Sequence, residues 1–518
     1  MTSWVHEFLI SPIGATASVM ASQIHALAYV LVSFTLVICF GLYYLLRPPK
    51  YPLGIPSIPF WVTLLPLVKD IDQEQIFRDY VQKPLQTHGA VKIFFASQWN
   101  ILVHRPSYLV ELFKREDDFQ KSGNNAKIPQ SVLASFLGDN IISSHGSTWK
   151  IYRDVIQPGL QRPFEHSSML ANARQLCHIL GQDQGAVSGQ GIPVQEAFQR
   201  YTTSNLARVI LETDFGTMQS RDAYLHSLQV RIKREIFKPL FMNFPVLDRL
   251  GLASRESARS LASHFTDQLV AAVEMSTSNT KLDPSSPVLA QRLVAARTLG
   301  QLSEQQFRDN LTISFVAGQE NPQLALLSIM YLLAKHPHIQ ELLHQEVVQT
   351  NTSEPQQELL QEMKLLTAVI LESLRLMPPI GQLVNRRAAQ DITLGTNMYI
   401  PRGTYLGYNC YSTNRDPHAW GPDADAFVPQ RWGASIPEIQ KTYRRRRARA
   451  EFISFHGGRR ACLGERFAML QLKVSLFVLV KTMRWKLDPN WKDQLTPAGP
   501  ICPKALKLII ESRDGLKG

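Results

Sequence analysis

A cysteine in a glycine-rich loop near the C-terminus is the feature that most restricts how this chain can fold. The loop reads FHGGRRACLG over residues 455–464, and the apolar segment FAML follows at residues 467–470. Gly458 and Gly464 allow the backbone to turn sharply and to approach a flat, bulky group. The apolar segment predicts a helix with Cys462 at its N-terminal end, where the helix dipole and free N–H groups lower the pKa of a thiol.

The chemistry that this cysteine favours is single-point ligation of a haem iron. A thiolate at a helix end can serve as the axial ligand of a haem, and His456 is the only other possible ligand in the loop. Zinc requires three or four clustered ligands, so this loop does not suit zinc. For an isolated cysteine the alternative is a buried structural residue in a glycine turn, because free cysteines are commonly buried.

Five positions of the loop match a known pattern. Phe455, Gly458, Arg460, Cys462 and Gly464 complete the pattern Phe-x-x-Gly-x-Arg-x-Cys-x-Gly. This resembles the haem-binding signature of the cytochrome P-450 family, which holds a b-type haem, here with the Cys462 thiolate as the expected axial ligand. The resemblance implies a mainly α-helical fold, with a large helical domain and a smaller β region, behind a membrane anchor.

Charge and cysteine content restrict the compartment and the partners. The 518 residues carry a formal net charge of +12, which favours an anionic membrane or an acidic protein partner. The sequence contains nothing that resembles a nucleic-acid-binding module, so nucleic acid is not an expected partner. The five cysteines are odd in number and widely spaced, which indicates a reducing compartment and no disulfide framework.

An uncharged apolar run near the N-terminus predicts a transmembrane helix. Residues 26–46 contain no charged side chain and are long enough to cross a bilayer core, although a buried core helix is the alternative. Arg47 and Lys50 follow, so the positive-inside rule places the rest of the chain in the cytosol. By resemblance to microsomal family members, the protein is expected to be a single-pass protein of the endoplasmic reticulum membrane. The expected segments are a lumenal N-terminus at 1–25, the anchor at 26–46, a proline-rich hinge at 47–60 and one catalytic domain at 61–518.

A long helix in the middle of the chain carries a second motif. Ser303 and Gln306 fit a capping box, so the helix is expected to begin near Ser303 and to end before His336-Pro337. Within it, the sequence AGQENP at residues 317–322 resembles the oxygen-binding motif of the same family.

Three residues of this motif are candidate catalytic residues. Gly318 is expected to let the helix pass close to the haem, and Glu320 is a candidate acid that supplies protons through water. Pro322 lacks an N–H, so the carbonyl of Gly318 loses its helical donor and opens a groove for water or dioxygen. Asn321 stands where the family usually has threonine, and an amide is a poorer proton relay than a hydroxyl. The alternative for Glu320 and Asn321 is a helix kink with satisfied polar groups.

Basic residues elsewhere are candidate partners of the haem propionates. Trp149 and Arg153 are four residues apart and therefore share one face of a predicted helix. In the family such a pair points towards a propionate, whereas alone it usually packs and is solvated. One of Arg386 and Arg387, which precede a predicted strand at residues 392–394, is also expected to bind a propionate. The resemblance leaves open which of the two points inward.

A charged group behind the loop is expected to be structural. Glu372 and Arg375 are three residues apart on a predicted helix at 364–376, where such a pair is usually solvated and contributes little. The resemblance implies instead that both meet Arg431 in a buried triad behind the Cys462 loop. Buried charges of this kind are tolerated only when all partners are present.

A run of basic residues precedes the loop. Residues 443–449 read YRRRRAR, in a connection at 433–450 that is longer than expected between the two flanking motifs. Such a run is most often a solvated face. On the proximal side of a haem it is expected to attract an acidic, flavin-bearing reductase that draws electrons from NADPH.

The sequence also predicts two short strands, one further helix and the loops around the substrate cavity. Strands are predicted at 91–95 and 100–103, and a helix from 106 to 114. By resemblance, the loops that shape the substrate cavity lie at 123–146, 191–252, 382–384 and 499–505.

The expected function is that of a haem-thiolate monooxygenase or oxidase. The resemblance implies the use of dioxygen and NADPH-derived electrons to hydroxylate or oxidatively couple a small organic substrate. Three stretches, 317–323, 449–460 and 496–503, are similar to the fungal dityrosine-forming subgroup, which implies a tyrosine-derived or other aromatic or peptide secondary metabolite. Two alternatives are a haem-binding sensor without turnover and a haem isomerase or dehydratase that needs no reductase.

Overall fold

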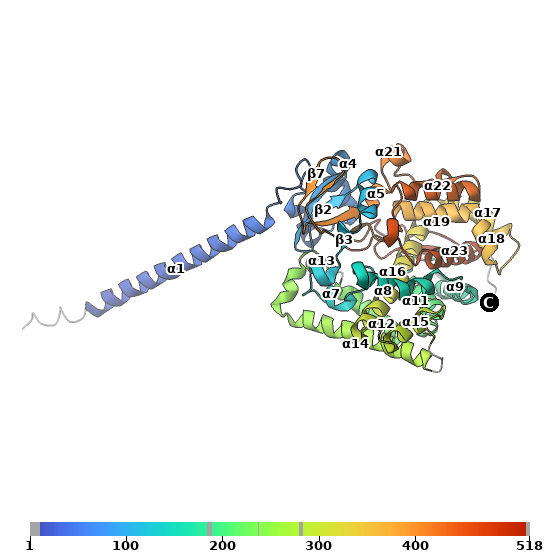
Figure 1. Ribbon diagram of the computed structural model, residues 1–518, viewed down its shortest axis with the longest axis horizontal. Coiled ribbons are helices and arrows are strands. Elements are labelled where there is room, and N and C mark those ends of the chain that lie inside the picture. Colours follow the sequence, from blue (N-terminus) through green and yellow to red (C-terminus); the bar gives the residue numbers. More distant parts are fainter. Residues whose placement is uncertain (1–10, 184–188, 237, 279–282, 514–518) are drawn as a thin grey trace, which may run out of the picture. The chain divides into compact units, whose positions relative to one another are not determined.

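The chain divides into two compact units, residues 1–50 and 51–518, and all the strands described below belong to the second. The computed structural model describes residues 11–183, 189–236, 238–278 and 283–513. Figure 1 shows the elements of both units in chain order. The division falls inside the segment predicted as a proline-rich hinge.

The smaller unit is built around one long helix, α1 (Ser11–Leu46). Its segment Ser22–Tyr44 contains 23 residues without Asp, Glu, Lys or Arg. At 1.5 Å per residue this segment is about 35 Å long, enough to cross the hydrocarbon core of a bilayer. The predicted anchor at 26–46 lies within α1, the one helix of the described ranges that is long and apolar enough to span a membrane.

Helices make up most of the larger unit, and α16 (Glu304–Lys335) runs through its middle (Figure 1). The other helices of the first half are α2 (Leu65–Val68), α3 (Gln73–Ile76), α4 (Gln82–His88), α5 (Pro106–Lys114), α6 (Asn124–Lys127), α7 (Val132–Leu137), α8 (Gly146–Gln161), α9 (Ser167–Gly181), α11 (Gln195–Leu206) and α12 (Tyr224–Ile236). Those of the second half are α13 (Pro239–Asn243), α14 (Ala253–Thr277), α15 (Leu289–Thr298), α17 (Pro337–Val348), α18 (Gln357–Glu362), α19 (Lys364–Leu376), α20 (Cys410–Thr413), α21 (Pro417–Trp420), α22 (Ile436–Ala448) and α23 (Glu465–Thr482).

The largest sheet of this unit has five strands in the order β1-β2-β8-β5-β3. β2 pairs antiparallel with β1 and parallel with β8, whereas β5 pairs antiparallel with both β8 and β3. These strands are β1 (Ala90–Phe95), β2 (Gln98–Val103), β3 (Phe119–Lys121), β5 (Gln382–Ala388) and β8 (Tyr405–Asn409). The smaller sheets contain β4 (Ile192–Pro193), β10 (Lys507–Ser512) and β9 (Met483–Leu487), and β6 (Ile392–Leu394) with β7 (Met398–Ile400). The register of β3 and β5 sets Lys121 beside Arg386.

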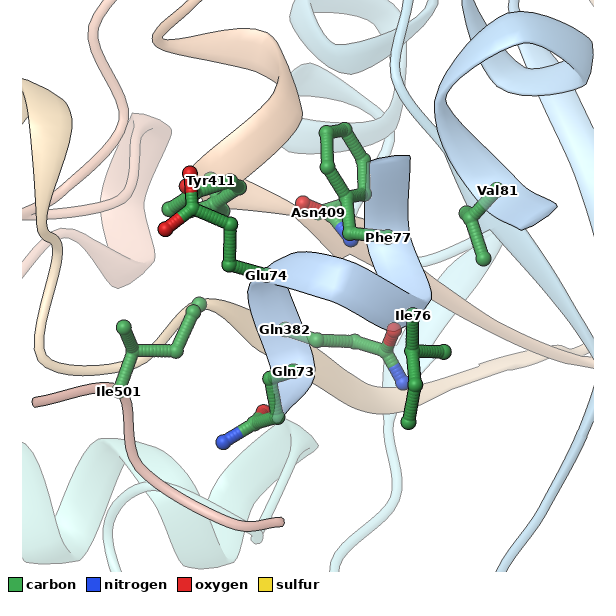
Figure 2. A pocket seen from close by; sticks show the side chains of 10 residues that line it. Gln73, Glu74, Ile76, Phe77, Val81, Gln382, Asn409, Tyr411 and Ile501 are labelled. Atoms are coloured by element: carbon green, nitrogen blue, oxygen red, sulfur yellow. The ribbon is translucent and has the colours of Figure 1, made fainter. Parts of the chain in front are cut away.

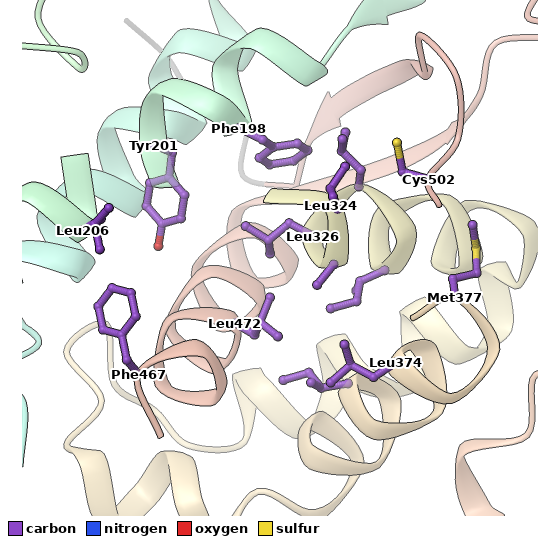
Figure 3. Packing of buried hydrophobic residues seen from close by; sticks show 14 of the residues in the cluster. Phe198, Tyr201, Leu206, Leu324, Leu326, Leu374, Met377, Phe467, Leu472 and Cys502 are labelled. Carbon is purple, nitrogen blue, oxygen red and sulfur yellow. The ribbon is translucent and has the colours of Figure 1, made fainter. Parts of the chain in front are cut away.

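The central helix begins where the sequence predicts. Ser303 Oγ accepts a hydrogen bond from Gln306 N at 3.2 Å, and Gln306 Oε1 accepts one from Ser303 N at 2.9 Å, which completes the capping box. The helix then continues through Pro322 to Lys335. Its apolar side chains, such as Leu326, join residues of α11, α19 and α23 in one buried core (Figure 3). This core fixes the helices that surround the candidate site.

Several other elements also agree with the sequence patterns. α5, α19 and β6 have the predicted bounds, and β1 and β2 match the two predicted strands within two residues. Most of the basic run at 443–449 lies in α22, a helix that the charge pattern alone did not predict. The mainly helical fold with a smaller β region is confirmed.

Glu372 and Arg375, both on α19, are completely buried and meet Arg431. Arg375 donates to the two carboxylate oxygens of Glu372 at 2.8 and 2.7 Å, and Arg431 Nε donates to Oε1 at 2.8 Å. The indole of Trp432 and the backbone N–H of Val428 add hydrogen bonds of 3.0 Å each. The Glu372 carboxylate is therefore fully surrounded by donors, as a buried charge requires.

The same arginine connects this triad to the loop that carries the cysteine. Arg375 Nη1 donates to the carbonyl of Asn414 at 3.0 Å. The Asn414 side chain in turn accepts from Ile453 N at 2.9 Å and donates to Ser454 Oγ at 2.8 Å. Because Ile453 and Ser454 directly precede the loop, the triad fixes where the loop starts.

Replacing Glu372 by glutamine is expected to destabilise the fold strongly. The variant Glu372→Gln leaves Arg375 buried without its counter-charge, which costs about 3–5 kcal/mol. Urea denaturation followed by circular dichroism measures the loss. The matched control is Asp423→Asn, because the Asp423 side chain accepts from Arg431 at 3.0 Å but is 53% exposed. We expect less than about 1 kcal/mol for that surface pair, and equal losses in the two variants would contradict the prediction.

Candidate functional site

The Cys462 loop is closed by its own backbone. Cys462 N donates to the carbonyl of Phe455 at 3.0 Å. Gly458 has a φ of +65° and starts a short 3-10 turn, Gly458–Arg460. α23 begins three residues after Cys462, so the cysteine lies at the N-terminal end of that helix, as the sequence predicts.

The two motif glycines of the loop have different neighbours. A Cβ on Gly458 would lie 2.6 Å from the carbonyl oxygen of Phe113 on α5, and the positive φ also requires glycine. Gly458 therefore allows close packing of the loop on α5, and its approach to a flat group stays a prediction. A Cβ on Gly464 would meet no described atom within 4 Å. Open space next to Gly464 can therefore accept a flat group near the cysteine.

The Cys462 thiol has an exposed surface, although it lies among buried surroundings. Burial raises the pKa of this thiol to about 11, and the backbone N–H of Gly464 opposes the rise. The expectation that the helix end alone lowers the thiol pKa is therefore wrong, because lost hydration outweighs the N–H groups. A metal cation bound to the sulfur displaces the proton. Cys462 is thus accessible within crowded surroundings, which leaves its sulfur available to a metal-centred group.

Four charged side chains, Lys121, Arg386, Arg460 and Glu116, gather beside the loop, and we name them the buried cation cluster. Lys121 and Arg386 are register partners and are 5% and 1% exposed. Arg460 Nη1 lies 3.1 Å from Glu116 Oε1. Burial lowers the pKa of Lys121 well below its usual value, and the charges of Arg386 and Arg460 add to this. Arg386 and Arg460 bring two cations against one carboxylate, and an anionic partner would also favour the protonated form of Lys121, so the cluster favours an anionic ligand.

Polar atoms in and next to this cluster lack hydrogen-bond partners within the described ranges. They are Arg386 Nε, Asn385 Nδ2, Ser144 Oγ, the carboxylate oxygen Glu116 Oε2, and Arg460 Nη1, which forms only the ion pair with Glu116 Oε1. Other atoms are satisfied, since Lys121 Nζ donates to Asn385 Oδ1 at 3.1 Å and Arg386 Nη1 donates to Phe119 O at 2.8 Å. Unpaired buried donors require acceptors, and the two propionates of a haem supply them. The cluster and the exposed thiol therefore fit a haem.

α8 holds the Cys462 loop from the side. Arg153 Nη1 donates to the carbonyl of Arg459 at 2.9 Å. The buried Trp149 ring has the guanidinium of Arg153 at 5.3 Å and that of Arg460 at 4.4 Å from its centre. Arg153 thus binds the loop backbone, and its predicted contact with a propionate stays a prediction.

The two arginines that are candidates for binding a haem propionate lie next to each other on strand β5 and point to opposite faces of it. Arg386 is buried in the cluster, whereas Arg387 is exposed and donates through Nε to the carbonyl of Gly403 at 3.3 Å. Neighbouring residues of a strand point to opposite faces. The structure therefore identifies Arg386 as the arginine that points inward.

In the central helix, Gly318 and Asn321 face different neighbours. A Cβ on Gly318 would lie 2.7 Å from Leu206 Cδ1, so this glycine lets α16 approach α11. The expected close passage of α16 to a haem at Gly318 stays a prediction. Asn321 Nδ2 donates to the carbonyl of Ala317 at 3.2 Å. The amide donor of Asn321 is thus engaged within its own helix.

Glu320 has a charged partner that the sequence did not predict. Its Oε1 lies 3.5 Å from Lys233 Nζ on α12, and these side chains are 12% and 21% exposed. Lys233 Nζ also donates to Gln323 Oε1 at 3.1 Å. The candidate acid is therefore held between the central helix and α12.

A pocket lies where β5, α3 and the C-terminal loop meet (Figure 2). Gln382 and Ile501 line it, and they come from two of the segments that the resemblance places around the substrate cavity. Its other lining residues are Gln73, Glu74, Ile76, Phe77, Val81, Gly381, Asn409 and Tyr411. Residues of the Cys462 loop are not among them, so this pocket is separate from the thiol.

Sequence reasoning missed Lys121 and Glu116. A single lysine in a three-residue strand belongs to no motif, and its neighbourhood depends on the pairing of β3 with β5. One signal was present, because Lys121 shares a strand face with Phe119, which is completely buried.

Comparison with known proteins identifies the family of this chain. The family model for cytochrome P450 matches residues 52–508. The chain is 41% identical over 463 residues to cytochrome P450-DIT2 of Saccharomyces cerevisiae, which covers 89% of this chain and 93% of that protein. It is 38% identical over 479 residues to cytochrome P450 monooxygenase xanG of Aspergillus fumigatus, which covers 90% and 89% of the two chains. A plant relative, 11-oxo-beta-amyrin 30-oxidase of Medicago truncatula, is 24% identical over 426 residues and covers 79% and 78%. The chain therefore belongs to the cytochrome P450 family, whose members are oxidoreductases that use haem with a cysteine thiolate as axial ligand.

Proposed function

We propose that this protein is a membrane-anchored P450 that hydroxylates or oxidatively couples a small aromatic substrate. It uses dioxygen and electrons from an NADPH-dependent flavoprotein reductase. The observation that carries the proposal is the exposed Cys462 thiol beside the buried cation cluster, which together fit the iron and the propionates of a haem. Fungal relatives at 41% and 38% identity support the resemblance to the dityrosine-forming subgroup, and hence a tyrosine-derived or peptide secondary metabolite as substrate.

The proposed roles follow the positions of the residues. Cys462 is the axial ligand, and Arg386, Arg460 and Lys121 bind the propionates. The loop and its supports are shaped by Phe455, Gly458, Gly464, Trp149 and Arg153. When bound, the haem supplies the activation of dioxygen, and the chain supplies orientation, protons and exclusion of water.

Proton supply is assigned to Glu320. Its carboxylate is held by Lys233, so a proton reaches it along a path that α12 controls. Asn321 is a poorer proton relay than a hydroxyl, because an amide nitrogen does not accept a proton in exchange for the one it donates, and one of its two N–H groups donates to the carbonyl of Ala317 at 3.2 Å. Asn321 in place of the usual threonine is the reason why oxidative coupling is proposed beside hydroxylation.

Membrane attachment is proposed at the endoplasmic reticulum, with the larger unit in the cytosol. Arg47 and Lys50 after α1 support this orientation. The larger unit also exposes apolar side chains on two segments that meet where α2 contacts α13. These side chains are Leu53, Trp61, Leu67, Val68, Leu240, Val246, Leu250 and Leu252. Together they favour contact with a lipid surface.

A turnover assay tests the proposed function. Membranes with this chain, a fungal reductase and NADPH are given N-acylated tyrosines, tyrosine dipeptides, a fatty acid and a sterol. We expect tyrosine-derived dimers that lack two hydrogens, detected by mass spectrometry, and more of the hydroxylated product from Asn321→Thr. Equal hydroxylation by both proteins without any dimer would contradict the coupling reaction. Turnover of a peroxide without any electron donor would favour the reductase-independent alternative.

The two arginines of β5 provide a matched test of propionate binding. Arg386→Gln is expected to lose a charged hydrogen bond of about 1.5–3 kcal/mol, or roughly tenfold or more in haem affinity. Arg387→Gln, one residue further on and exposed, is expected to leave haem affinity unchanged. The rate of haem transfer to apomyoglobin measures both. Faster transfer from the Arg387 variant than from the Arg386 variant would reverse the assignment.

The exposed basic residues of α22 form the proposed reductase surface. Arg446 and Arg447 are engaged in the fold, because they pair with Glu451 and Glu465 at 2.7 and 2.8 Å. Lys441, Arg444 and Arg445 are exposed instead. An exposed basic helix near the Cys462 loop attracts an acidic flavoprotein by long-range electrostatics.

The double variant Arg444→Ala/Arg445→Ala is expected to weaken the reductase interaction. Loss of two exposed charges costs about 1 kcal/mol, or roughly fivefold in the reductase concentration at half-maximal rate. The difference should shrink at high salt, because ions screen surface charges. The control Arg484→Ala/Lys486→Ala removes the same charge from exposed residues of β9. Kinetics that are alike in the two double variants would argue against α22 as the docking surface.

A further inference from the structure

The segment 138–144, which we name the strap, connects α7 to α8 and is braced by its own side chains. Asn140 Oδ1 accepts from Ile142 N at 2.9 Å, and Ser143 Oγ accepts from Asn140 N at 3.0 Å. Outside the strap, Tyr152 of α8 donates to Asp139 Oδ2 at 3.4 Å. These hydrogen bonds hold the strap together as one unit, and its backbone groups bind two different neighbours.

On one side, two buried side chains of the central helix hold the backbone of the strap. Asp309 Oδ2 accepts from Asp139 N at 2.9 Å, and Asn310 Oδ1 accepts from Ile141 N at 3.0 Å. Burial raises the pKa of Asp309 to about 6, so its carboxylate is mostly ionised at neutral pH. Gly138 has a φ of +55°, and a Cβ there would lie 2.0 Å from the Asp309 carboxyl carbon. The strap is thus built to receive this carboxylate.

On the other side, the carbonyls of the strap hold Arg460. Arg460 Nη2 donates to Ser144 O at 2.6 Å and to Ile141 O at 3.3 Å. The Arg460 side chain is only 3% exposed. Ile141 therefore joins the two sides directly, because its N–H binds Asn310 and its carbonyl accepts from Arg460.

We propose that Asp309 and Asn310 are positioning residues that orient the guanidinium of Arg460 at the edge of the haem through the strap. This rests on the proposed function only in assigning a haem propionate to Arg460. Both side chains lie on the N-terminal half of α16, before the 317–322 motif. Residues of the central helix outside its motif would therefore determine the position of a cation, Arg460, that binds a haem propionate.

The physical reason is the cost of an unsatisfied buried N–H. Without the Asn310 acceptor, the buried N–H of Ile141 is left without a partner unless the backbone shifts to find another acceptor. A shift of the strap relieves this cost and moves the carbonyls that hold Arg460. A cation that moves away from the haem edge stabilises the reduced state less, so the reduction potential falls.

The test compares two buried polar residues of α16. Asn310→Leu removes the acceptor of Ile141 N, whereas Thr312→Val removes a hydrogen bond to Thr266 of 3.2 Å that lies away from the strap. We expect haem transfer to apomyoglobin to be roughly fivefold faster for Asn310→Leu, together with a lower reduction potential. Asn310→Asp keeps the oxygen acceptor and is expected to restore both values. Thr312→Val is expected to leave both unchanged.

Two outcomes overturn the inference. One is an unchanged transfer rate and potential in Asn310→Leu, and the other is an equal change in Thr312→Val, which would show general loosening of the helix. If Asn310→Leu does not accumulate, Asn310→Ser makes the same comparison, since a serine hydroxyl is too short to reach Ile141 N.

A double variant tests the route through Arg460. With Arg460→Gln in place, Asn310→Leu is expected to have little further effect on haem transfer, because both act on one contact. Additive effects would overturn the route. Haem transfer requires neither substrate nor reductase, so this inference can fail while turnover succeeds, and turnover of the substrate panel can fail while the inference holds.

Discussion

The buried carboxylate of Glu372 is the interaction on which the candidate site depends. It neutralises Arg375 inside the protein, and Arg375 then holds Asn414, which binds the backbone just before the Cys462 loop. Each step is a hydrogen bond between groups that cannot reach water, so breaking one leaves a desolvated polar group behind. The position of the cysteine is therefore set by charge neutralisation on a different helix, and only secondarily by the glycines of its own loop.

The buried charges around Glu372 and those of the buried cation cluster differ in which groups stay without a hydrogen-bond partner. Around Glu372, two arginines meet one buried carboxylate, and Asp423 neutralises Arg431 from the surface. In the cluster beside the loop, only Glu116 offsets the cations, and Arg386 Nε has no partner in the described ranges. The charges around Glu372 all have partners within the protein, so they stabilise the fold. The buried cation cluster has more cations than anions, so it can bind an anionic ligand. The balance of charge therefore distinguishes the structural group from the candidate binding group without reference to a sequence motif.

The sequence predicted the features that depend on residues close together in the chain. It missed the features that depend on how distant strands pair. The start of α16 follows from the Ser303 capping box, and the apolar segment after the loop predicted that Cys462 lies at the N-terminal end of a helix, here α23. The choice between Arg386 and Arg387 needed the strand that contains them, and Lys121 needed the register of β3 against β5. The thiol pKa was misjudged for a similar reason, because the burial that raises it comes from segments distant in sequence.

The residues of the 317–322 motif in the central helix have different structural roles. With 3.6 residues per turn, neighbouring positions point in directions about 100° apart, so one motif meets several partners. Gly318 approaches α11, Glu320 meets Lys233 of α12, and Asn321 binds back to Ala317 within the helix. The ion pair of Glu320 with Lys233 connects the motif to a second helix. The carboxylate pairs with a residue of α12, so the proton supply that we propose for Glu320 is coupled to the position of α12 through one ion pair.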